Sequence, residues 1–169
     1  MNEPWKPVSM SSLVIGVPAA VVFWIHALRS SDGFLLLDFV NLPFHEFGHL
    51  LFGTIGENIG LWGGTLFQLI VPFGILVSFF LRRDPAGTAF GAFWFGENLL
   101  NISAYIADAR KMDLPLVGGG EHDWNIILSG LTILKYDTLI GGVVKTSGWL
   151  VMTGAVAWFI IKGLTDRED

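Results

Sequence analysis

The sequence predicts an all-α membrane protein: a polytopic bundle of about five transmembrane helices, with one short amphipathic helix at the interface. Of the 169 residues, 52% are hydrophobic and only 15% are charged, and the mean hydropathy of +0.58 exceeds that of ordinary soluble domains. The charged residues gather between long apolar runs. We therefore expect an integral, multi-pass membrane protein in which residues 1–169 form a single helical domain surrounded by membrane lipid.

Apolar runs that end in polar residues, Gly or Pro define the expected spans. They are Ser12–Leu28, Phe34–Ile55, Leu61–Leu81, Gly87–Ala107 and Gly142–Ile161. The first run lacks a small-residue cleavage site, so we expect it to be retained and not removed as a signal peptide.

The short amphipathic helix is expected after a polar connection that contains Gly118, Gly119 and Gly120. Asp123 is a candidate N-cap for this helix. Its apolar face would consist of Trp124, Ile127, Leu128 and Leu131. A helix of this length cannot cross a bilayer, so we expect it at the interface or packed over the bundle.

Charge and cysteine content exclude several classes of function. The net charge is −5 without a basic stripe, so nucleic acid is not an expected partner. The chain has no cysteine, so any metal must be held by nitrogen and oxygen ligands. Basic residues divide equally between the two sides of a five-span bundle, with Lys6 opposite Arg82 and Arg83. The paired arginines favour a cytoplasmic position for their own side.

The second expected span contains the motif His45-Glu46-Phe47-Gly48-His49. Positions i and i+4 share one face of a helix, so His45 and His49 can hold one zinc ion. Glu46 can then act as general base on a water that zinc activates. The alternative is that the two histidines only join helices through hydrogen bonds.

A row of polar residues surrounds this motif. Asp38 and Asn41 precede His45 and His49 at spacings of three and four, so all four project from one helical face. Polar side chains at membrane depth are expected to face a cavity or another helix. Pro43 lacks a backbone donor, and with Asn41 as a cap it predicts a break in the helix.

A catalytic zinc ion usually has three protein ligands, so one more is required. The fourth span presents Glu97, Asn101, Tyr105 and Asp108 on one face, and the loop offers His122 and Asp123. Asp108 and His122 are equal candidates for the third ligand, and Glu97 follows. Asp108 could instead pair with a nearby basic residue, His122 could be an ordinary loop histidine, and Glu97 could be a protonated carboxyl bonded to an amide. Binding by both Asp108 and His122 would close the coordination sphere and favour a structural site.

These motifs resemble those of the site-two-protease-like intramembrane zinc metalloproteases. The resemblance covers the motif from His45 to His49 and, more loosely, the segment from Asn98 to Asp108. It implies that His45, His49 and Asp108 bind zinc, that Glu46 activates water, and that the substrate is a membrane-spanning segment of another protein. In this chain Asn101 and Ala109 stand where the family carries a proline and a glycine.

The leading hypothesis is a zinc-dependent intramembrane peptidase with Glu46 as the catalytic base. The competing hypothesis is a non-catalytic accessory subunit, bound to partner subunits of a larger membrane complex, with zinc as a structural element. A third is a haem or pigment ligated by His26, His45 or His49 in such a complex. His26 is isolated in the first span and is more typical of a histidine that bonds to a helix or the interface.

Overall fold

The computed structural model describes residues 4–30, 34–115 and 121–167. In these three stretches the chain is helical and contains no strand, which confirms the all-α prediction. The elements are α1 (Met10–Arg29), α2 (Asp38–Gly53), α3 (Glu57–Leu81), α4 (Pro85–Ala107), α5 (Asp123–Gly130), the 3-10 turn η2 (Leu134–Tyr136) and α6 (Asp137–Thr165).

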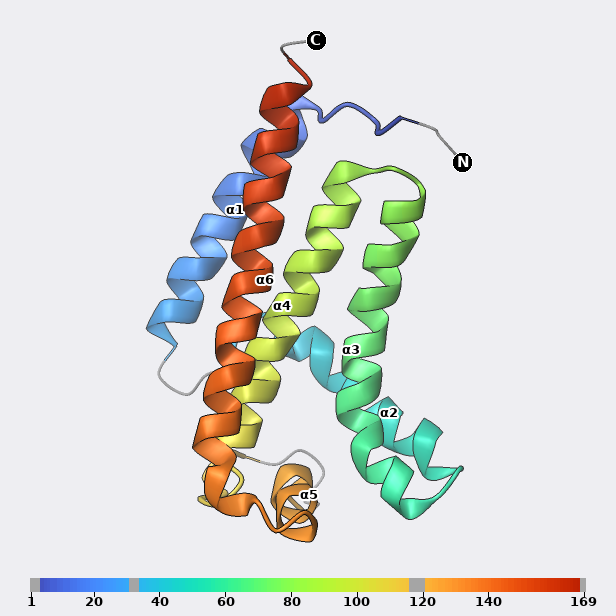
Figure 1. The fold of residues 1–169 in the computed structure, drawn as a ribbon, viewed down its shortest axis with the longest axis vertical. Coiled ribbons are helices and arrows are strands. Elements are labelled where there is room, and N and C mark those ends of the chain that lie inside the picture. The colour runs from blue at the N-terminus through green and yellow to red at the C-terminus, as the bar shows by residue number, and fades with distance from the viewer. Residues whose placement is uncertain (1–3, 31–33, 116–120, 168–169) are drawn as a thin grey trace.

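Four long helices lie side by side along the long axis of the molecule (Figure 1). Helix α4 lies between α3 and α6 and packs against both, whereas α1 touches mainly α6. Helix α2 crosses the lower part of α3, and α5 covers the same end of the bundle (Figure 1). The start of α1 and the end of α6 lie at the opposite end of the bundle (Figure 1).

The structure does not support the predicted count of five spans. Among the described residues, three helical segments are long and apolar enough to cross a membrane: Met10–Arg29, Glu57–Leu81 and Leu134–Thr165. Helix α2 has 16 residues, not the 22 expected from Phe34 to Ile55. At a rise of 1.5 Å per residue it measures about 24 Å, short of the roughly 30 Å hydrocarbon core. Helix α4 is long enough, but buried polar residues interrupt its apolar character: Thr88, Glu97, Asn98 and Ser103.

The predicted helix break at Pro43 is absent. Helix α2 runs through Pro43 without interruption, and its N-cap residue is Leu37. The Asn41 side chain makes no cap. It instead donates to Asp38 and Glu97 and accepts from the indole of Trp94. Asn41 therefore connects α2 to α4 across the bundle.

Two glycines allow α2 and α3 to approach closely beside the histidine motif. A Cβ atom on Gly48 would collide with the backbone of Gly63, and a Cβ on Gly63 would collide with the backbone of Gly48. Glycine is thus required at both crossing positions, because any side chain would force the helices apart. This contact fixes the face of α2 that carries His45 and His49 against α3.

The N-terminal segment is held at the α3–α4 turn. The Lys6 backbone N–H donates to Arg83, its ammonium lies 3.5 Å from the Asp84 carboxylate, and the Val8 N–H donates to Asp166. Lys6 therefore lies at the same end as Arg82 and Arg83, not opposite them as five spans required. His26 accepts a backbone hydrogen bond from Leu36, which fits the structural role expected for it.

The amphipathic helix occurs as α5. Trp124, Ile127 and Leu128 are buried against α4 and neighbouring residues, whereas Leu131 lies beyond the helix and is exposed. The N-cap is His122 and not Asp123, since Nδ1 of His122 accepts the Asn125 N–H. Gly118, Gly119 and Gly120 of the polar connection before this helix lie outside the described residues.

Candidate metal centre

Three potential ligand atoms converge between α2, α3 and α5. The Nε2 atoms of His45 and His49 are 3.1 Å apart. The Asp123 Oδ2 atom lies 3.2 Å from the first and 3.1 Å from the second. In a tetrahedral zinc site with bonds of about 2.0–2.2 Å, ligand atoms are separated by roughly 3.3–3.6 Å. A small outward shift of these side chains would therefore fit the ion, and together they form a group able to hold a metal.

The far side of each imidazole identifies its tautomer. His45 Nδ1 lies 3.1 Å from the Gln68 side-chain oxygen, and His49 Nδ1 lies 2.8 Å from the Gly60 carbonyl oxygen. Carbonyl oxygens only accept hydrogen bonds, so both Nδ1 atoms carry hydrogen. In the neutral rings the two Nε2 lone pairs then face each other and the Asp123 carboxylate. Either a metal ion between these atoms or a proton on an imidazole Nε2 that is donated to Asp123 would relieve their repulsion. The Nδ1 contacts are of the kind that outer-shell partners make with metal-bound histidines.

Gly64 on α3 leaves space beside the ligand atoms. A Cβ atom at this position would collide with Nε2 of both His45 and His49. The glycine therefore leaves the volume next to the two lone pairs free of protein atoms. Any other residue would push the two imidazoles away from their present positions.

The start of α5 brings Asp123 to the histidines. Because His122 caps the helix, the Asp123 carboxylate is free to point at α2. The Tyr105 hydroxyl accepts the Asp123 N–H at 3.2 Å and lies 3.5 Å from Oδ2. Burial alone would raise the pKa of Asp123, but the imidazoles of His45 and His49 outweigh it and lower the pKa to about 2. Asp123 is thus a carboxylate at any physiological pH.

Glu46 directly follows His45 in the chain and is not one of the three residues of this group. Its side chain is exposed, whereas His45 is buried. It is close enough for its charge to act on both His49 and Tyr105.

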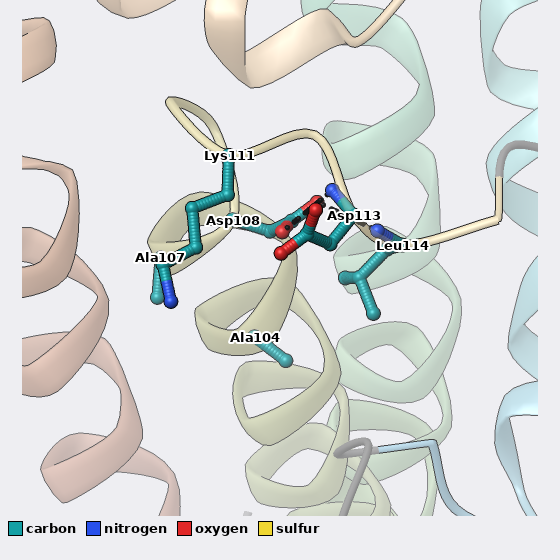
Figure 2. A pocket seen from close by; sticks show the side chains of 6 residues that line it. All are labelled: Ala104, Ala107, Asp108, Lys111, Asp113 and Leu114. Atoms are coloured by element: carbon teal, nitrogen blue, oxygen red, sulfur yellow. Dashed lines mark hydrogen bonds between the residues drawn. The ribbon is translucent and has the colours of Figure 1, made fainter.

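Asp108 and His122, the equal candidates for the third ligand, form a separate pair. The Asp108 carboxylate accepts the backbone N–H groups of Asp113 and Leu114 at 3.1 and 3.0 Å. Figure 2 shows these contacts at a surface pocket of about 230 Å³. His122 Nε2 lies 3.4 Å from Asp108 Oδ2, a long contact, and neither residue belongs to the group around His45.

Glu97, the other candidate ligand, lies deeper in the bundle. It is fully buried and accepts from Asn41 at 2.8 Å, so it has an amide partner of the kind expected if it does not bind metal.

The sequence analysis named Asp123 in the loop near the site but interpreted it as the cap of the short helix. The available signal was its neighbour: a histidine can cap a helix through Nδ1, which releases the aspartate that follows it.

Comparison with family models, with characterised proteins and with solved structures finds no match to this chain. The likeness to site-two-protease-like enzymes therefore stays a prediction from motifs. The ligand geometry here departs from what that likeness implies, since Asp123 and not Asp108 faces the histidines.

Proposed function

We propose that this protein is a zinc-dependent peptidase of the membrane, with His45, His49 and Asp123 as the metal ligands. The observation that carries the proposal is the triangle of three potential ligand atoms separated by 3.1–3.2 Å, next to which Glu46 follows His45 in the chain. Two imidazoles and one carboxylate are a ligand set typical of catalytic zinc, which leaves its fourth position open. The His49 and Asp123 side chains remain 26% and 14% exposed, so the site is accessible.

Zinc, when bound, supplies the Lewis acidity that activates water and polarises a peptide carbonyl. Glu46 takes the proton of the attacking water and delivers it to the leaving amine. The Tyr105 hydroxyl, which already touches Asp123, is the nearest protein donor for the developing oxyanion. Asp123 stays ionised and balances the positive charge of the metal.

The arrangement of helices supports a membrane location for this chemistry. Helices α1, α3, α4 and α6 cross the bilayer in this proposal, which puts both termini on one side. The short helix α2 enters from the α5 side and does not cross. Its lipid-facing side is apolar, since Phe39, Val40, Phe47 and Leu50 are exposed. A membrane-embedded protein segment would reach Glu46 along this face.

The decisive experiment compares wild type with Glu46→Gln, both purified as the full chain in detergent micelles. Elemental analysis should give one zinc per chain for both proteins, because Glu46 is not a ligand. Cleavage of a quenched fluorescent peptide with an apolar, helix-breaking sequence should be lost only in the variant. Retained cleavage by Glu46→Gln, or the absence of bound zinc in wild type, would overturn the proposal.

The accessory-subunit hypothesis is favoured by one observation, the weak attachment of α1. Only 6% of the α1 span is buried, and it contacts mainly α6. A partner subunit could cover this face, and the metal would then be a structural element. Copurification at a fixed ratio with a larger assembly, together with zinc that Glu46→Gln leaves unchanged and no cleavage by wild type, would support this function instead.

A further inference from the structure

Helices α1 and α6 run side by side (Figure 1) and leave an apolar crease between them. The crease has a volume of about 440 Å³, and seven of its eight lining residues are apolar. On its inner side, Leu13 lies against Gly163 of α6 and packs on a buried cluster that contains Phe159. Its rims are open, since Val14 and Leu164 are 62% and 55% exposed. The crease is therefore a formed groove that no described part of the chain fills.

The one charged lining residue, Arg167, lies at the outer end of the crease. Ile160, Leu164 and Arg167 follow one another at spacings of four and three, so they line the same side. At a rise of 1.5 Å per residue this side is about 10 Å long, which is less than half of the roughly 30 Å hydrocarbon core. Arg167 comes just after α6 ends at Thr165. If α6 crosses a membrane, the crease lies in one leaflet and Arg167 lies at the depth of the lipid headgroups.

The Arg167 guanidinium has no strong acceptor among the described residues. Its Nη2 lies 2.9 Å from the Met10 sulfur, which is a weak acceptor. The neighbouring carboxylate of Asp166 pairs with Lys162 and accepts the Val8 N–H at 2.9 Å. A guanidinium presents five donors in a planar fork that matches the oxygens of a phosphate. Arg167 thus has donors to offer to an anion at the mouth of the crease.

The same end of the molecule has the features of a membrane interface. The Trp5 ring contacts the rings of Phe80 and Trp158, and the Arg83 guanidinium lies 5.4 Å from the centre of the Trp5 ring. Tryptophans gather at the level of the headgroups in membrane proteins. Basic residues outnumber acidic ones among the described residues of this end: Lys6, Arg82, Arg83, Lys162 and Arg167 against Asp84 and Asp166. Such an excess attracts anionic lipids.

We propose that the crease between α1 and α6 binds an anionic phospholipid, with an acyl chain along its apolar walls and the phosphate at Arg167. A thin apolar chain that ends in an anion matches both the shape and the charge of the groove. A protein helix matches less well: at about 10–12 Å across it takes roughly 120–170 Å³ per residue, so the crease would hold about three of its residues. The site lies at the opposite end of the bundle from the metal centre and does not depend on the proposed peptidase function.

The test counts lipids bound to the full chain in detergent micelles by native mass spectrometry, as phosphatidylglycerol or phosphatidylcholine is added. Wild type should bind phosphatidylglycerol about fivefold more tightly, the equivalent of one basic side chain at an anionic surface. Arg167→Gln should reduce this preference to less than about twofold. No preference in wild type would overturn the proposal. That result is expected if Glu168 and Asp169, which follow Arg167 in the chain, neutralise its charge.

Arg82→Gln is the matched control for the charge. It removes one positive charge from the same end of the molecule, and Arg82 is exposed and does not line the crease. This variant should keep the preference of wild type for phosphatidylglycerol. Equal losses for Arg82→Gln and Arg167→Gln would overturn the proposal, because they would show that the summed charge of this end attracts the lipid without a defined site.

The apolar part of the crease is tested by filling it. Val14→Phe puts a larger ring on the open rim and should lower the affinity for phosphatidylglycerol about tenfold, the equivalent of two methylene groups kept out of the crease. Ile15→Phe is its control, since Ile15 is also exposed on α1 but does not line the crease. It should bind as wild type does. Equal binding by both variants would show that no acyl chain lies in the crease. Release of a copurified protein by Val14→Phe, without lipid binding by wild type, would make the crease a subunit contact and overturn the lipid site.

Discussion

His122 and Asp123 are neighbours in the chain, yet they belong to two clusters. The clusters differ in which atoms of their histidines carry hydrogen and where those hydrogens point. In the loop cluster, Asp108 and His122, the carboxylate accepts two backbone N–H groups. His122 accepts the Asn125 N–H through Nδ1, so its own hydrogen lies on Nε2, which is 3.4 Å from Asp108 Oδ2 and makes no hydrogen bond. In the metal cluster, His45, His49 and Asp123, both histidine hydrogens point away and three lone-pair atoms face one another.

The difference shows why residue type alone does not identify a metal site. Both clusters combine histidine with aspartate, and both are largely buried. In the metal cluster the Nδ1 hydrogens of the neutral imidazoles point to Gln68 and Gly60, so the Nε2 lone pairs are left facing Asp123. A metal ion could enter the first cluster without displacing a backbone hydrogen bond, whereas at Asp108 it would compete with the N–H groups of Asp113 and Leu114.

The largest expected effect comes from removing each of the two aspartates that could be the third ligand. Asp123→Ala should lower zinc affinity more than about 100-fold, beyond the range for outer-shell partners. Asp108→Ala should keep one zinc per chain but lower the free energy of unfolding by about 1–3 kcal/mol, because two backbone N–H groups lose their acceptor. Chelator competition and thermal melts measure the two effects. Zinc lost from Asp108→Ala and kept by Asp123→Ala would restore the ligand set implied by the family resemblance.

Sequence reasoning found the residues with the clearest periodicity. The spacing of His45 and His49 fixed their common face without tertiary information, and the polar row through Asp38 and Asn41 does face another helix. Asp123 could not be assigned, because its position depends on a cap made by His122 and on the packing of α5 against α4. The span count failed for a related reason: hydropathy does not reveal that α2 ends after 16 residues.

The pH dependence of zinc binding distinguishes the contributions of the ligands. The pKa of Asp123 is lowered to about 2 from the ordinary value of 3.8. Its contribution to stability is therefore present above the unfolded value and is lost only as the pH falls toward about 2. Between about pH 5 and 7, protons compete with zinc only at the two imidazoles, so affinity should change by at most about 100-fold per pH unit. A steeper dependence, measured by chelator competition, would mean that a third proton is displaced and that Asp123 is protonated in metal-free protein.

Gly64→Ala should lower zinc affinity about 10- to 100-fold, because its Cβ would lie against both Nε2 atoms. Gly74→Ala is the matched control, as a Cβ there meets no atom within 4 Å on the same helix. It should bind zinc as wild type does and gain a little helix stability. If the two variants bind zinc equally well, the space beside Gly64 has no part in the site.

The smallest expected effect concerns Tyr105, which positions Asp123 without belonging to the metal cluster. In Tyr105→Phe the Asp123 N–H loses its acceptor and the carboxylate loses a neighbouring hydroxyl. The cost of about 1 kcal/mol corresponds to roughly a fivefold lower zinc affinity. Tyr136→Phe is the control, since Tyr136 is exposed and contacts Lys135. A loss as large as that of Asp123→Ala would make the phenol oxygen a ligand in its own right. An unchanged affinity would mean that the His122 cap alone fixes the start of α5, and the division between the two clusters would then depend on that histidine.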